Sequence, residues 1–146
     1  MLEYDANPDK KPLYSIILVN LIMCTYAIIV TILKMSLLGK AVFCSLWGCL
    51  FVFATLNQGR VYRYPCTTWG DRTLAVALLG GYIYFYPSME WWHYVWGIVA
   101  IFILSTTTWL KSQYTVQQYV WTVNLWHAMV MGLVYFVPNQ LQERSI

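Results

Sequence analysis

The residues best suited to chemistry in this sequence are its two histidines, His93 and His127. His127 follows Asn124 by three positions, so the two side chains share a face if this apolar stretch is a helix. Polar side chains in the middle of a membrane helix either hydrogen-bond to a neighbouring helix or line a site in the protein interior. Asn124 and His127 are therefore candidates for both roles. Asn20 and the hydroxyls of residues 105–108 are the hydrogen-bonding partners to consider.

His93 and its neighbour Trp92 stand where another apolar stretch begins. Amphipathic rings favour the membrane–water interface, so we interpret both as interfacial side chains, with a lipid or ligand contact as the alternative. A helix rises about 1.5 Å per residue. Counting along the expected helices places His93 and His127 at different depths, which argues against one haem iron bound between them.

Other chemical constellations are missing from the sequence. We find no serine–histidine–acid arrangement, no glycine-rich phosphate loop and no CxxC pair among the four cysteines. Two histidines and dispersed acids do not supply a metal cluster, and the scattered basic residues do not form a nucleic-acid-binding stripe. We expect no catalytic residue, no metal, no resident cofactor and no nucleic-acid partner. These expectations favour a protein that is not an enzyme.

The elements that would position these residues are apolar helices. Hydrophobic residues make up 60% of the 146 residues and charged residues only 10%, against about 25% charged in soluble domains. A membrane-spanning helix needs about 20 mainly apolar residues. We predict an all-α, multi-pass transmembrane bundle forming a single domain over residues 1–146. The expected spans cover residues 13–33, 41–56, 73–86, 91–110 and 119–137.

Three details of this prediction concern the boundaries of the spans. The third expected span is the weakest because it is short and contains Gly80-Gly81. Residues 57–72 are expected to form the longest polar loop, and Pro138 is expected to end the fifth span.

The distribution of basic residues gives an orientation. With five spans, six of the nine Lys and Arg residues fall on the side of the N-terminal arm. The positive-inside rule then places the N-terminus on the cytoplasmic or matrix-like side of a membrane that the sequence does not identify. Bound lipids are expected.

Small residues recur at helical spacing on two of the expected spans. One stripe consists of Ala41, Ser45 and Cys49, and the other of Thr73, Ala77 and Gly81. Small residues let membrane helices approach closely. The stripes predict either packing inside the bundle or docking on another subunit, and the sequence leaves both open.

A longer pattern resembles a known family. The chain contains YDANPDKKPLYSIILVNLI and, further on, SLWGCLFVFATLNQGRVYRYPCTTWGDRTLAVALL. Over residues 4–112 this resembles the C-terminal membrane tail of sterol-desaturase and fatty-acid-hydroxylase proteins of the alkylglycerol-monooxygenase kind. In that tail a span ends near a glycine and an arginine, here Gly59 and Arg60, and an acid and an arginine open the next span, here Asp71 and Arg72. That family's catalysis relies on many histidines, so the resemblance implies a non-catalytic helical appendage.

These observations favour a non-catalytic, multi-pass accessory subunit of a larger membrane complex, with other membrane subunits and lipids as partners. The alternative is a protein that binds a lipid or small hydrophobic molecule, with Asn124 and His127 as polar anchors and His93 and Trp92 as further contacts. A channel or carrier is disfavoured because no acidic residue is expected deep in a span.

Overall fold

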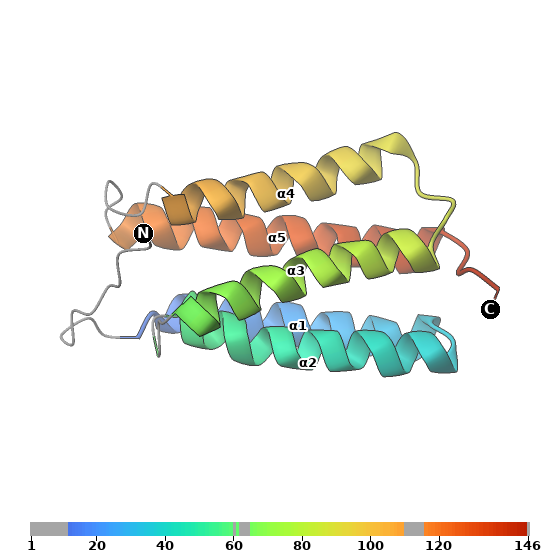
Figure 1. Ribbon diagram of the computed structural model, residues 1–146, viewed down its shortest axis with the longest axis horizontal. Coiled ribbons are helices and arrows are strands. Elements are labelled where there is room, and N and C mark those ends of the chain that lie inside the picture. The colour runs from blue at the N-terminus through green and yellow to red at the C-terminus, as the bar shows by residue number, and fades with distance from the viewer. Residues whose placement is uncertain (1–11, 60, 62–64, 110–115, 146) are drawn as a thin grey trace.

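The computed structural model describes residues 12–59, 61, 65–109 and 116–145, and every regular element in this part of the chain is an α-helix. The bundle is therefore all-α, as predicted. Its helices are α1 (Tyr14–Lys34), α2 (Leu37–Asn57), α3 (Pro65–Phe85), α4 (Trp91–Trp109) and α5 (Val116–Gln140). All five run along the same long axis of the molecule (Figure 1).

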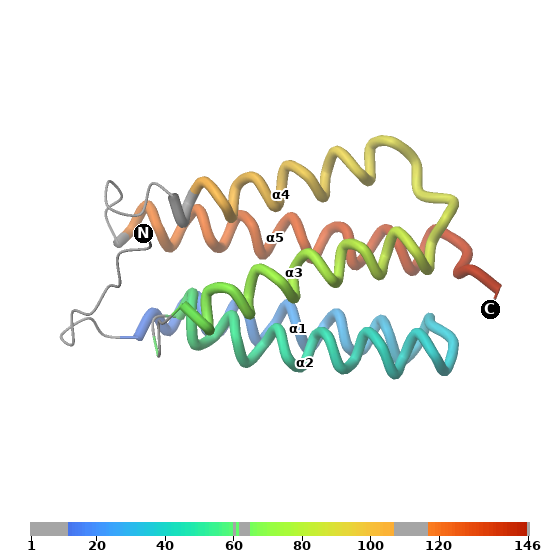
Figure 2. Tube along the Cα trace, viewed as in Figure 1, coloured from blue at the N-terminus to red at the C-terminus, as the bar shows by residue number. Residues whose placement is uncertain are grey.

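The helices follow one another around the bundle in an order different from the chain order. The extensive contacts join α4 to α5, α5 to α1, α1 to α2, and α2 to α3. The helices α3 and α4 meet far less closely, although a short loop connects them (Figure 2). The bundle is thus a five-helix ring with a seam between α3 and α4.

The interior face of each helix follows from helical periodicity. On α2 the buried apolar side chains are Phe43, Trp47, Leu50 and Ala54, spaced four, three and four residues apart. Such spacing keeps side chains on one face of a helix. The same spacing on α1 places its buried side chains against α2 and α5. The core therefore lies along the axis of the ring.

The outer faces are apolar as well. Three helices are long and apolar enough to cross a membrane, namely Tyr14–Lys34, Leu37–Asn57 and residues 117–140 of α5. A shorter apolar stretch, Trp91–Thr106, belongs to α4. Large apolar side chains such as Leu33, Phe102 and Trp121 are more than half exposed on the bundle surface. An apolar exterior of this kind fits a hydrocarbon solvent, and the chain is a membrane protein.

The start of α2 differs from the prediction. The second span was expected at residue 41, but α2 begins at Leu37, so only Met35 and Ser36 separate it from α1. Ser36 is the N-cap of α2, and its side chain accepts a hydrogen bond from the Gly39 amide. The spans expected at residues 13–33 and 41–56 left residues 34–40 as a connection, and this was wrong because the capped helix includes Lys40 in its first turn.

The long polar loop predicted for residues 57–72 was also wrong. Helix α3 begins at Pro65, eight residues before the predicted span, and proline is favourable in the first turn of a helix. Pro138 does not end the fifth helix, because α5 continues to Gln140. Proline is tolerated in membrane helices when neighbouring groups compensate for the missing amide.

Candidate functional site

The middle of α5 carries a group of buried polar atoms that have no hydrogen-bond partner. These are the Asn124 amide oxygen, the Trp126 indole nitrogen and both ring nitrogens of His127. His127 is fully buried and Trp126 is 2% exposed. A buried donor or acceptor without a partner costs about 1–3 kcal/mol, so three such side chains within one turn of helix require an explanation.

The interhelical hydrogen bond considered for this group is absent from the described residues. Asn20 instead turns to α2, where its Nδ2 donates to the Phe51 carbonyl oxygen at 3.2 Å and to Thr55 Oγ1 at 3.1 Å. The Asn20 Oδ1 accepts from the Cys24 thiol at 3.6 Å. The side chains of Thr107 and Thr108 lie outside the described residues. Asn20 therefore fastens α1 to α2 and does not satisfy His127.

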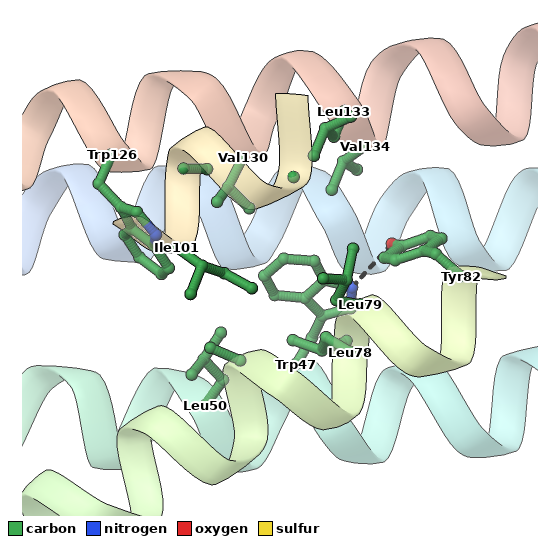
Figure 3. Close-up of a pocket in the computed structure, with 13 residues that line it drawn as sticks. Trp47, Leu50, Leu78, Leu79, Tyr82, Ile101, Trp126, Val130, Leu133 and Val134 are labelled. Carbon is green, nitrogen blue, oxygen red and sulfur yellow. Dashed lines mark hydrogen bonds between the residues drawn. The ribbon is translucent and has the colours of Figure 1, made fainter. Parts of the chain in front are cut away.

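Trp126 lines a cavity inside the ring of helices (Figure 3). The cavity has a volume of about 60 Å³ and is bounded by α2, α3, α4 and α5. Its lining is almost entirely apolar and carries no charged side chain. The lining residues are Trp47, Leu50, Ala75, Leu78, Leu79, Tyr82, Gly97, Ala100, Ile101, Trp126, Val130, Leu133 and Val134.

Two tryptophans of this cavity differ in their hydrogen bonding. The Trp47 Nε1 donates to the Tyr82 hydroxyl at 3.1 Å, which joins α2 to α3. The Trp126 Nε1 has no acceptor. In Figure 3, Trp126 and Tyr82 lie at opposite ends of the cavity, and the Trp126 nitrogen is on the side toward Ile101. The lining therefore includes one indole whose N–H has an acceptor and one indole whose N–H is buried without an acceptor.

The other two candidates from the sequence, Trp92 and His93, lie at the start of α4. His93 is 1% exposed, so its ring is enclosed by protein at this end of the helix. Its Nδ1 accepts the Glu90 backbone amide at 3.0 Å, and its ring stacks on Trp92 with centroids 3.6 Å apart. The His93 Nε2 has no partner. Trp92 donates through Nε1 to the Glu90 carboxylate at 2.7 Å. These contacts cap the start of α4.

The structure does not bring the two histidines together. The ring of Trp92, beside His93, packs edge-on against Phe136 of α5, with centroids 6.1 Å apart. Phe136 follows His127 by nine positions, which corresponds to roughly 14 Å along the helix. The depth difference expected from the sequence is present. Among the described residues, no group of three or more His, Cys, Asp or Glu side chains is arranged to hold a metal ion.

Sequence reasoning missed a third polar cluster, which joins α2 to α3. Asp71 is fully buried, and its Oδ2 accepts hydrogen bonds from Asn57 Nδ2 and Gln58 Nε2, each at 2.8 Å. Thr68 Oγ1 donates to Asn57 Oδ1 at 2.8 Å, and Tyr119 of α5 donates its hydroxyl to the Gln58 carbonyl oxygen at 3.3 Å. The usable signal was the spacing of Thr68 and Asp71, which share a helix face when α3 starts at Pro65.

Comparison with known proteins assigns this chain to no family. No protein-family model matches the chain, no curated protein matches it, and no solved structure matches it.

Proposed function

We propose that this protein is a multi-pass accessory subunit of a larger membrane complex and contacts its partner through one face of α2. The supporting observation is the position of the small-residue stripe predicted from the sequence. Ala41, Ser45 and Cys49 are all exposed on the outer face of α2. A Cβ added at Gly48 beside them would meet nothing within 4 Å. The stripe is therefore not used for packing inside the bundle.

The outer face of α1 provides the comparison. There the exposed residues include Leu18, Ile22, Ile29 and Leu33, which are large side chains suited to lipid. A helix face that contacts only lipid has no need of small residues, because acyl chains adapt to an apolar surface of any shape. Small residues instead let another helix approach the backbone closely. This contrast between the two outer faces favours α2 as the docking face.

In the proposed arrangement all five helices cross the membrane. The helices α3 and α4 run alongside the three helices that are long and apolar enough to span a membrane, which supports crossing by the complete bundle. The beginning of α1 and the end of α5 lie at opposite ends of the bundle (Figure 1). The excess of basic residues assigns the end near the start of α1 to the cytoplasmic or matrix-like side.

Site-specific photo-crosslinking in the native membrane tests this proposal. A photoreactive amino acid would replace Cys49 on the stripe or, as the matched control, Ile29 on the outer face of α1; both positions are exposed. We expect a discrete protein adduct from position 49 and only lipid adducts from position 29. Lipid adducts alone from both positions would contradict the proposal.

A second test uses bulk on the stripe. Ser45→Phe should release the chain from its partner during extraction in mild detergent, because an added ring keeps two helix backbones apart. Leu21→Phe on α1 is the control, since Leu21 is 46% exposed and already large. Equal co-purification of the partner with both variants would refute docking through α2.

A further inference from the structure

The connection between α3 and α4 buries side chains that a surface turn would ordinarily leave in water. Tyr86, Met89 and His93 are each 8% exposed or less. The Tyr86 hydroxyl and the His93 Nε2 have no hydrogen-bond partner among the described residues. Because His93 Nδ1 accepts the Glu90 amide, a neutral His93 ring carries its hydrogen on Nε2. The closed connection therefore buries two donors without acceptors, which opposes its closure.

The chain that follows α5 crosses this same end of the bundle, and we call its residues 141–145 the C-terminal strap. Arg144 donates from its backbone amide to the Phe85 carbonyl oxygen at 2.6 Å and from Nε to the Tyr84 carbonyl oxygen at 2.9 Å. The Arg144 guanidinium lies 4.8 Å from the centre of the Tyr84 ring. Tyr84 and Phe85 directly precede Tyr86, so the strap holds the residues at which the buried connection begins.

Glu143 attaches the strap to the start of α2. Its carboxylate accepts hydrogen bonds from the backbone amide and the hydroxyl of Ser36. A Cβ at Gly39 would lie 2.9 Å from Glu143 Oε1, so the carboxylate lies close against the first turn of α2. The helix α5 itself makes extensive contacts with α1 and α4 but not with α2 or α3. The strap is therefore a polar link from α5 to α2 and α3.

Two opposing terms act on the connection. The side-chain hydrogen bonds of Glu143 and Arg144 are exposed, and exposed charges are screened by salt. The buried donors of Tyr86 and His93, by contrast, gain hydrogen bonds to water whenever the connection opens. The strap favours the closed connection and the two donors favour the open one. Such a balance is typical of segments that open locally while the rest of the fold stays intact.

We propose that the C-terminal strap is a latch on the α3–α4 connection, and that its release lets residues 86–93 open locally and brings the Tyr86 hydroxyl and the His93 Nε2 to the aqueous side. When the latch is closed, both groups are hidden. When it is open, both can donate hydrogen bonds outside the bundle. This inference does not rest on the proposed complex, because every contact involved lies within one chain.

The two histidines of the chain provide a test with an internal control. His93 is 1% exposed and His127 is 0% exposed, and each has a ring nitrogen without a partner. Diethyl pyrocarbonate acylates accessible neutral imidazoles, and peptide mass spectrometry measures the rate at each histidine. In the full chain in lipid nanodiscs, we expect His93 to be modified much faster than His127, because His127 lies in the middle of α5 and away from the strap.

Variants of the strap assign the opening to the latch. Glu143→Gln removes the charge that binds Ser36. We expect the modification of His93 to become roughly tenfold faster, because a tenfold larger open population corresponds to about 1.4 kcal/mol, close to the contribution of one hydrogen bond to a charged group. Gln142→Ala is the matched control, since Gln142 is exposed beside Glu143, and it should leave the rate unchanged. His127 should keep its rate in both variants.

Salt provides a second test that needs no variant. Raising the ionic strength from about 0.05 M to about 0.5 M shortens the Debye length and weakens exposed charge contacts. The modification of His93 in the unaltered protein should therefore become faster at high salt. The double variant Glu143→Gln/Arg144→Gln should show little dependence on salt, because its strap no longer carries these two charges.

Three results would overturn the latch. A His93 rate that is the same in Glu143→Gln and in the unaltered protein would show that the strap does not control the connection, and so would a rate in the unaltered protein that ignores salt. Equal acceleration at His93 and His127 would show that the whole bundle loosens. Equal rates at the two histidines of the unaltered protein would show that the connection does not open locally.

Discussion

The Glu143 carboxylate binds the start of a helix that lies 107 residues earlier in the chain. Its Oε2 accepts the Ser36 backbone amide at 2.7 Å, and its Oε1 accepts the Ser36 hydroxyl at 2.5 Å. A negative charge at a helix N-terminus is favourable because it meets the unpaired amides there. The next residue, Arg144, donates through Nε to the Tyr84 carbonyl oxygen at 2.9 Å at the end of α3. The C-terminal tail therefore fastens α2 and α3 at one end of the bundle.

This contact predicts that Glu143→Ala destabilises the bundle by about 1 kcal/mol, the usual size of an N-cap contribution. Thermal unfolding in mild detergent would measure the loss. Ser36→Ala should cost a similar amount, and the double variant should cost less than the sum because both act on one contact. Strict additivity of the two single effects would show that Glu143 and Ser36 act separately. Gln142→Ala is the control, because Gln142 is exposed directly beside Glu143.

The Asp71 cluster predicts a larger effect at the other end. Asp71→Leu leaves the Asn57 and Gln58 amides buried without their acceptor, at about 1–3 kcal/mol for each. Thr73→Leu is the matched control, because Thr73 is exposed on the same helix two residues later. Denaturant unfolding should separate the two variants clearly. Similar stabilities would mean that Asp71 contributes no net stabilisation.

For two tyrosines at the end of α3, we expect the same change, Tyr→Phe, to affect stability differently. Tyr82→Phe leaves the Trp47 N–H without an acceptor and should cost about 1–3 kcal/mol. Tyr86→Phe should cost nothing, because the buried Tyr86 hydroxyl has no partner to lose. Thermal unfolding of the two variants side by side checks this. A larger loss for Tyr86→Phe than for Tyr82→Phe would reverse the assignment.

Two glycines, Gly132 on α5 and Gly80 on α3, provide a similar pair. A Cβ at Gly132 would lie 2.7 Å from Cζ2 of Trp96, a rigid ring held by its hydrogen bond to Met129. Gly132→Ala should therefore destabilise by about 1–3 kcal/mol, as overpacking does. A Cβ at Gly80 meets nothing within 4 Å, so Gly80→Ala should stabilise α3 by about 0.5–1 kcal/mol. Midpoints of thermal unfolding that move in the same direction would contradict this contrast.

The proposed five crossings predict the accessibility of two cysteines in sealed vesicles. Cys66, exposed at the start of α3, and an introduced Gln142→Cys in the tail should react with an impermeant maleimide from opposite sides. The positive-inside proposal assigns Cys66 to the cytoplasmic or matrix-like side. A protein with Cys66 replaced by serine serves as the background for position 142. Labelling of both positions from one side would exclude three crossings, or any odd number, between residues 66 and 142.

How far the sequence predicts this fold depends on where the determining contacts lie. The first helix was predicted to within one residue at each end, since an uninterrupted apolar run marks a membrane helix without reference to the rest of the chain. The start of α2 was predicted four residues too late. Its cap, Ser36, is reinforced by Glu143 from the opposite end of the sequence, and local patterns carry no trace of that contact.

The start of α3 was missed for a related reason. Taken one at a time, three residues look like loop residues, namely Asn57, Thr68 and Asp71. Side chains of these types can hydrogen-bond to the nearby backbone, which favours turns and helix caps. In the structure they satisfy one another across α2 and α3 and so become tolerable inside the bundle.

The candidate site was predicted only in part. Asn124 and His127 were singled out as polar residues in an apolar helix, and the structure buries polar atoms of both without partners. Trp126 between them escaped attention because an aromatic residue in an apolar helix looks like ordinary packing. Its unsatisfied N–H becomes visible only when the rotation of α5 and the cavity beside it are known.

The order of helices around the ring has a consequence for biogenesis. Helix α1 leaves the ribosome well before α5, yet the two are neighbours along much of their length. Ile16 of α1 is fully buried against Tyr119 and Val123 of α5, so its final surroundings exist only after α5 has been translated. Until then the inserted α1 holds this face open to lipid or to an insertion factor. Quality control that senses an uncovered α1 would thus detect any chain that stops before α5.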